Sequence, residues 1–156
     1  SKDETRLSNT QTLCFYSNKF KEHNLYSCFK TESEFLYKDS LDFAKSKSSH
    51  QSIILNSKNE IVETSISNVY FINSLGEIHT PKISTGCVDG SMRKLLMSKL
   101  EIYETNIQKN HIQNYEEVFL SNAIKGIQIV HRIEDKTFST AKSKMIQMRF
   151  NKLLHQ

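Results

Sequence analysis

The chain has 156 residues, of which 37% are hydrophobic and 10% aromatic, and its formal net charge is +4. This length predicts one domain with a core of its own, and the aromatic content excludes a disordered polymer. No apolar run approaches the roughly 18 residues that a spanning helix needs, and the first residues are polar and mixed in charge, so we expect a soluble protein without a membrane segment or a secretory signal.

The positive charge is concentrated near the C-terminus. Residues 131–156 carry six of the 21 basic residues and two of the 17 acidic ones, so the rest of the chain is balanced. This distribution favours a solvated helix face over a nucleic-acid-binding stripe. The three cysteines (Cys14, Cys28 and Cys87) form no CxxC pair, and no histidine has the spacing of a metal ligand. We therefore expect free thiols in a reducing cytoplasm and no metal centre.

The predicted elements begin with a strand at 11–16, after a lead-in of ten residues. A helix is expected from Phe29 to about Lys47, where the chain lacks Gly and Pro and where Leu36 and Phe43 lie seven positions apart. Short strand-forming runs separated by turn residues follow at 52–55, 60–65, 68–72 and 77–80. The middle of the chain is therefore predicted to be a β meander.

A second helix is predicted after the glycine-containing loop 86–93, with Asp89 as its N-cap. Apolar residues then follow at helical spacing: Met92, Leu95, Leu96, Leu100 and Tyr103. Strands are expected at 117–120 and 127–133. A closing helix should carry one stripe made of Ala141, Met145 and Met148. Because strands and helices interleave, the fold class is predicted to be mixed α/β.

Four places could carry chemistry, and each also has an ordinary structural explanation. Lys30 could lose its charge in a cleft and act as an imine-forming amine or a general base, or it could be one more surface lysine. Glu63 is either a solvent-facing acid, which strand alternation favours, or an inward carboxylate paired with a cation. The loop 86–92 could hold a phosphate on free N–H groups at a helix start. The polar residues at 120–123 are either a plain turn or the rim of a site.

Five sequence blocks, taken in order, resemble the larger C-terminal domain of the class IV pyridoxal-phosphate aminotransferases. They are Lys30-Thr31, 63–71, Thr80-Pro81, 86–93 and 117–123. The family includes branched-chain aminotransferase, D-amino acid aminotransferase and aminodeoxychorismate lyase. The resemblance implies a mixed sheet partly closed as a pseudo-barrel with flanking helices. It also implies that residues 11–156 form the cofactor-binding domain and that residues 1–10 lead in from a preceding N-terminal domain.

The resemblance also assigns roles to individual residues. Lys30 is implied to bind pyridoxal 5′-phosphate covalently and to move the proton at the substrate carbon, and Glu63 to face the ring nitrogen. A ring that withdraws electrons needs such a carboxylate partner and a fixed phosphate anchor. The phosphate is implied to lie on the backbone N–H groups of Ser91 and Met92 and on the Ser91 hydroxyl. The remaining implied cofactor contacts are Asn122 and Ala123, and Arg93 is implied to be structural.

Two departures within the family pattern bear on the activity. Phe35 stands where branched-chain enzymes have a tyrosine, and the Ser121-Asn122-Ala123 corner is more similar to the lyases. These features favour aminodeoxychorismate lyase, which makes 4-aminobenzoate and pyruvate for folate biosynthesis, over an aminotransferase of the D-amino acid or branched-chain type.

The partners expected from the family are a small amino substrate, an N-terminal domain that completes the phosphate and substrate sites, and a second subunit in a homodimer. Neither a nucleic acid nor a membrane is expected. Since the N-terminal domain has no counterpart in this sequence, a non-catalytic dimerisation remnant is the alternative to an enzyme.

Overall fold

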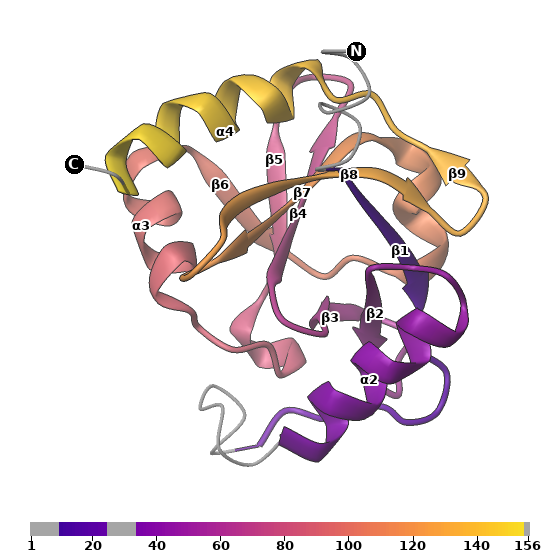
Figure 1. Ribbon diagram of the computed structural model, residues 1–156. Coiled ribbons are helices and arrows are strands. Elements are labelled where there is room, and N and C mark those ends of the chain that lie inside the picture. Colours follow the sequence, from indigo (N-terminus) through magenta and orange to yellow (C-terminus); the bar gives the residue numbers. More distant parts are fainter. Residues whose placement is uncertain (1–9, 25–33, 155–156) are drawn as a thin grey trace.

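The computed structural model describes residues 10–24 and 34–154 (Figure 1). Three α-helices occur in these ranges: α2 (Glu34–Ser46), α3 (Ser91–Lys99) and α4 (Ala141–Leu154). The strands there are β1 (Gln11–Phe15), β2 (Gln51–Leu55), β3 (Ile61–Thr64), β4 (Asn68–Asn73), β5 (Ile78–Pro81), β6 (Ile102–Thr105), β7 (Tyr115–Asn122), β8 (Gly126–Ile133) and β9 (Lys136–Thr137). Short 3-10 turns lie at Ile83–Thr85 and Lys109–Asn114. The predicted mixed α/β class is confirmed.

All nine strands belong to one mixed sheet in the order β3-β2-β1-β8-β7-β4-β5-β6, with β9 paired to β8. The two ends of this order meet. The Ile61 N–H at the start of β3 donates to the Ile107 carbonyl just beyond β6 at 2.8 Å, and the Lys109 N–H donates to the Asn59 carbonyl at 2.9 Å. These bonds join the edges of the twisted sheet, so the sheet is nearly closed into the expected pseudo-barrel.

The sheet is covered on both faces, and side chains alternate between two cores. Along β4, Val69 and Phe71 point into the interior of the curled sheet, whereas Tyr70 and Ile72 point outward beneath α3 and α4. The outward Tyr70 ring stacks on the Phe119 ring of β7 at 4.7 Å between centroids. Because both faces of the central strands are buried, these strands are near-continuous apolar runs.

The predicted β meander is right for two consecutive antiparallel pairs, β2–β3 and β4–β5, but wrong at the step between β3 and β4. β3 and β4 follow one another in sequence, but β2, β1, β8 and β7 lie between them in the sheet. The chain bends after Thr64, whose N–H donates to the Ser67 carbonyl at 2.9 Å. This bend directs β4 to the opposite part of the sheet, where it pairs with β5 and β7. Consecutive strand patterns do not reveal which strands become neighbours.

Three details of the predicted helices are also wrong. The residue that caps α3 is Gly90, with no side-chain hydrogen bond, and Asp89 instead binds Arg93 through an ion pair of 3.1 Å. The helix ends at Lys99, so Tyr103 lies on β6. The predicted apolar stripe of α4 faces outward, since Met145 is 71% exposed and Met148 64% exposed. The buried side of α4 carries Ser143 and Phe150.

Helix α4 is held at its first turn by a buried acid of β7. Both oxygens of the Glu117 carboxylate accept hydrogen bonds from the helix start: from the Lys142 N–H at 3.1 Å and from the Ser143 N–H and hydroxyl at 2.9 Å each. A negative charge at this position satisfies N–H groups that have no partner within the helix.

We expect Glu117→Gln to destabilise the domain by about 1–3 kcal/mol, because the amide nitrogen then faces N–H donors in a buried site. Urea unfolding followed by circular dichroism measures this loss. The neighbouring Glu116 is exposed, so Glu116→Gln is the matched control and should leave the unfolding midpoint in place. Equal midpoints for the two variants would contradict this role of Glu117.

Candidate functional site

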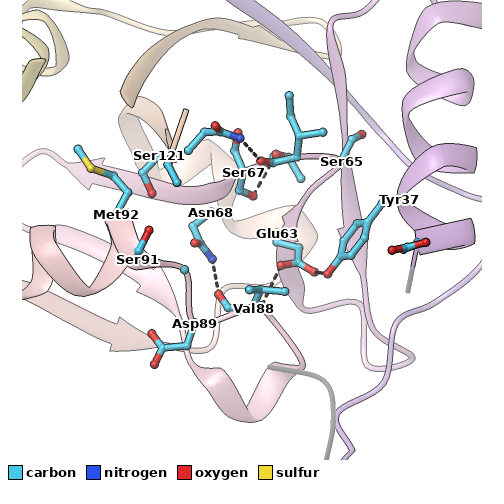
Figure 2. Close-up of a pocket in the computed structure, with 16 residues that line it drawn as sticks. Tyr37, Glu63, Ser65, Ser67, Asn68, Val88, Asp89, Ser91, Met92 and Ser121 are labelled. Atoms are coloured by element: carbon cyan, nitrogen blue, oxygen red, sulfur yellow. Dashed lines mark hydrogen bonds between the residues drawn. The ribbon is translucent and has the colours of Figure 1, made fainter. Parts of the chain in front are cut away.

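A cavity of about 630 Å³ opens where the ends of several elements converge. Its walls come from α2, the turn between β3 and β4, the start of α3 and the corner that follows β7. Figure 2 shows Tyr37 and Glu63 on one side of this space and Ser91, Met92 and Ser121 on the other. Three of the sequence blocks far apart in the chain, 63–71, 86–93 and 117–123, thus contribute to one cavity.

Glu63 lies at this cavity and is only 3% exposed. Its Oε2 accepts hydrogen bonds from the Tyr37 hydroxyl at 2.6 Å and from Lys21 Nζ at 2.7 Å, and its Oε1 accepts from the Val88 N–H at 2.9 Å. The expectation from strand alternation that Glu63 faces solvent is therefore wrong. The alternative, an inward carboxylate paired with a cation, is the arrangement observed, with Lys21 as the cation.

The phenol of Tyr37 stays protonated in this arrangement. Burial, followed by the charge and the hydrogen bond of Glu63, raises the pKa of Tyr37 above its ordinary value. The hydroxyl therefore donates to Glu63 and accepts from Lys21 Nζ, which lies 2.7 Å away. The three side chains form a closed hydrogen-bonded triangle at the edge of the cavity.

The opposite wall is the N-terminus of α3. Ser91 and Met92 are the first two residues of the helix, and both line the cavity. The N–H groups of a first helical turn have no partner within the helix and favour an anion. The loop is held by Asn68, whose side-chain N–H donates to the Val88 carbonyl at 2.8 Å. Arg93 has a structural position, with its guanidinium bound to Asp89 and to Glu104 at 2.6 Å.

One polar atom at the cavity lacks a partner among the described residues. The Ser67 hydroxyl is buried, lines the cavity, and makes no hydrogen bond within this part of the chain. The neighbouring Ser121 hydroxyl, by contrast, is bonded to the Tyr70 hydroxyl at 2.7 Å. Because an unsatisfied buried hydroxyl is unfavourable, Ser67 is a candidate to bind a polar ligand atom.

The corner after β7 lines the cavity through Asn122 and Ala123. The Asn122 side chain is already used within the protein: its amide N–H donates to the Ile66 carbonyl at 2.6 Å, and its oxygen accepts from the Ile124 N–H at 2.8 Å. This residue shapes the corner and links it to the turn between β3 and β4.

The predicted covalent residue, Lys30, lies outside the described residues. Helix α2 is described from Glu34 onward, and the side chain of Phe35 is 71% exposed. The phenol at the site comes instead from Tyr37, two residues further along the same helix.

The sequence did not predict four residues at the site. Three of them line the cavity, namely Tyr37, Ser67 and Asn68, and the fourth, Lys21, contacts Glu63. Asn68 and Ser67 lie inside the block that carries Glu63, so their place beside it could have been inferred. Lys21 has no such signal, because its segment contributes no recognisable motif and reaches Glu63 only through the tertiary fold.

The segment that carries Lys21 is fixed by its backbone neighbours. The Lys21 N–H donates to the Leu55 carbonyl at 2.9 Å, and the Glu22 carboxylate accepts from the Ser57 N–H at 2.7 Å. Gly86, at φ +112°, packs against this segment: a Cβ there would lie 3.2 Å from the His23 nitrogen. The backbone therefore needs glycine at this position.

We expect Gly86→Ala to destabilise the domain by about 1–3 kcal/mol, because it combines a left-handed φ with a close backbone contact. Thermal or urea unfolding measures the effect. Gly76→Ala is the matched control, since Gly76 also has a positive φ (+81°) but an added Cβ would meet only Lys142 Nζ at an ordinary 3.5 Å. A loss no larger than that of the control would contradict the contact with the His23 backbone.

The described chain contains two buried cysteine thiols. Cys87 is 1% exposed, and burial raises the pKa of its thiol to about 11, so it is protonated at neutral pH and is a poor nucleophile. Cys14 is a second buried free thiol.

Within residues 10–24 and 34–154, no group of His, Cys, Asp or Glu side chains could hold a metal ion. In the same ranges no helix is both long and apolar enough to cross a membrane.

The fold is that of the class IV aminotransferases. The sequence model of that family, described as amino-transferase class IV, matches residues 2–133, and the chain belongs to this family. No curated protein matches the chain in sequence.

Solved structures of the same fold cover about 90% of this chain. A Legionella pneumophila protein assigned as a 4-amino-4-deoxychorismate lyase is similar at 21% identity and a TM-score of 0.80, over 90% of this chain and 55% of that one. The Escherichia coli branched-chain amino acid aminotransferase is similar at 16% identity and a TM-score of 0.81, over 90% of this chain and 51% of that one. The Thermobaculum terrenum branched-chain amino acid aminotransferase, solved in its PLP form, is similar at 16% identity and a TM-score of 0.81, over 92% of this chain and 50% of that one.

The chain spans about half the length of these solved structures. The residues that line the cavity nevertheless fit the cofactor of the family, pyridoxal phosphate. A buried carboxylate is available for the ring nitrogen, the start of α3 is available for the phosphate, and the Ser67 hydroxyl lacks a partner in the described chain.

Proposed function

We propose that this chain is the cofactor-binding domain of a cytoplasmic pyridoxal-phosphate enzyme, and that the enzyme is an aminodeoxychorismate lyase. One observation carries the proposal. The buried carboxylate of Glu63 and the N-terminus of α3 lie on opposite walls of a single cavity. A carboxylate for a protonated ring nitrogen and a helix start for a phosphate are the two anchors that this cofactor requires.

When bound, the cofactor supplies an electron sink for the electron pair left on the substrate carbon after its proton is removed. Lys30 would be the residue that holds the cofactor, and its amine would take the proton from the carbon that carries the substrate nitrogen. The Glu63 carboxylate would hold the ring nitrogen. The Ser91 hydroxyl and the first N–H groups of α3 keep the phosphate in place.

In the lyase reaction, loss of the proton is followed by release of pyruvate, and the aromatic product 4-aminobenzoate remains. An aminotransferase of the family would use the same lysine and glutamate but release a keto acid. The lyase is supported by the Ser121-Asn122-Ala123 corner, which lies at the cavity, and by the exposed Phe35 in place of a cofactor-binding tyrosine.

The remaining walls of the site are proposed to come from outside this chain. In the family, an N-terminal domain contributes to the phosphate and substrate sites, and subunits pair as homodimers. In the described chain the large apolar side chains Phe35, Ile66 and Ile124 are exposed. Of these, Ile66 lines the cavity directly. We propose that a further domain of a longer polypeptide covers this side and excludes water from the reaction.

Two measurements test the proposal. Addition of pyridoxal phosphate should produce a new near-visible absorption band, and borohydride reduction followed by peptide mass spectrometry should locate a pyridoxyl group on Lys30. With the complementing domain present, 4-amino-4-deoxychorismate should yield 4-aminobenzoate and pyruvate. Transfer of an amino group to a keto acid would instead identify an aminotransferase. Absence of any cofactor adduct would favour the non-catalytic dimerisation module.

A further inference from the structure

Lys21 is a buried charged group in contact with two residues that line the cavity, Glu63 and Tyr37. Its side chain is 4% exposed, and Nζ lies 2.7 Å from Glu63 Oε2 and 2.7 Å from the Tyr37 hydroxyl. Lysine is almost never buried to this extent without a matched acceptor. The contact therefore joins an ammonium directly to the carboxylate that is proposed to face the ring nitrogen of the cofactor.

The contacts around Glu63 divide its two oxygens between different tasks. Oε1 accepts the Val88 N–H at 2.9 Å, which ties β3 to the loop before α3. Oε2 receives both Lys21 and Tyr37. Because each oxygen of a carboxylate has two lone pairs, Oε1 keeps acceptor capacity for a ligand after the Val88 bond is made. The triangle thus fixes the rotation of the carboxylate about its axis.

The ion pair also places a positive charge directly beside Glu63. A carboxylate that is 3% exposed is costly to bury unless a cation lies close by. Tyr37 supplies a hydrogen bond to Oε2 but no charge. Among the described residues within salt-bridge distance of Glu63, the cation is Lys21.

We propose, resting on the function proposed above, that Lys21 is a positioning residue of the cofactor site: its ammonium keeps the Glu63 carboxylate ionised and oriented, ready to hold a protonated ring nitrogen. The position of Lys21 itself does not depend on this pair, because its backbone N–H is bonded to Leu55 and the next residue, Glu22, to Ser57. Its side chain therefore acts on Glu63 from a segment held by other contacts.

Isotope-edited infrared spectroscopy of the full chain, labelled with ¹³C-carboxyl glutamate, tests this role without any cofactor. In Lys21→Met, we expect a protonated-carboxyl band at neutral pH that disappears in the Lys21→Met/Glu63→Gln double variant. Tyr37→Phe removes a hydrogen bond but no charge, so it should not produce the band. Lys94→Met is the matched lysine control, because Lys94 is 66% exposed and pairs with Asp89 at 3.8 Å.

A measurement on the unaltered protein keeps the test independent of how well the variants fold. Nitrogen-15 spectra of labelled lysine should show one ammonium signal protected from exchange with water, and this signal should vanish in Lys21→Arg. Absence of a protected signal would overturn the proposal. So would a protonated-carboxyl band of equal size in Tyr37→Phe, or no such band in folded Lys21→Met.

Cofactor binding provides a further test of the role of Lys21. Titration with pyridoxal phosphate, followed by absorbance, should show binding to Lys21→Met that is weaker than to the unaltered chain by about tenfold or more, the factor expected for loss of one charge-assisted contact. Lys94→Met should bind as the unaltered chain does. If the unaltered chain binds no cofactor, the proposed function fails for this chain, whereas the infrared and nitrogen-15 results still decide the role of Lys21. Unchanged affinity in Lys21→Met would overturn that role in the cofactor site.

Discussion

Glu63→Ala should destabilise the domain by about 3–5 kcal/mol, the range found when one partner of a buried ion pair is removed. The substitution takes away the carboxylate that Lys21 binds at 2.7 Å and the acceptor of the Tyr37 hydroxyl at 2.6 Å. The Val88 N–H loses its acceptor as well. Three buried donors are thus affected at once, and urea unfolding measured by fluorescence and by circular dichroism should show the loss.

A double variant separates the ion pair from simple cavity formation. In Lys21→Met/Glu63→Leu both charges are replaced by apolar side chains, so much of the lost stability should return. The free energy of unfolding of Glu63→Gln should lie between those of Glu63→Ala and the unaltered chain, because its amide oxygen still accepts hydrogen bonds but carries no charge. If Glu63→Ala lowers the free energy of unfolding by less than about 1 kcal/mol, the pair behaves like an exposed one and the buried geometry is wrong.

Lys30→Ala should abolish covalent capture of the cofactor. The proposed reaction needs one amine to bind the aldehyde and later to accept the substrate proton, and alanine can do neither. After incubation with pyridoxal phosphate and borohydride, mass spectrometry should find the pyridoxyl group on Lys30 in the unaltered chain and at no specific site in the variant. The free energy of unfolding without cofactor should change little.

Lys38→Ala provides the matched control for this capture, because Lys38 is an exposed lysine of α2. It should retain the adduct on Lys30. Retention of a specific adduct in Lys30→Ala would transfer the covalent role to another amine. Lys21 would then be the first residue to examine, since its ammonium binds Glu63, which lines the cavity.

Much of the local structure follows from the sequence. The strand predicted at 11–16 and the turn at 56–59 correspond to β1 and to the connection between β2 and β3. The glycine-containing loop and the apolar spacing after it predict α3, because a short amphipathic helix is determined by residues three and four apart. The family and its pseudo-barrel fold were likewise recognisable, since five motif blocks retain their order along the chain.

Long-range contacts could not be obtained in the same way. The exposed Met145 and Met148 of α4 and the separation of β3 from β4 depend on which surfaces meet in the folded domain. Glu63 shows the reason most clearly. Alternation along a strand predicts a solvent-facing side chain only when one face of the sheet is open, and β3 is buried on both faces.

The sequence by itself determined the strands and helices, the family, and the residue types available for chemistry. Only the tertiary structure decided that Glu63 points inward, that Tyr37 takes part, and that Lys21 supplies the charge beside it. The physical reason is that a buried charge is tolerated only beside a partner. That partner comes from a segment 42 positions away in the sequence, so no local pattern could reveal it.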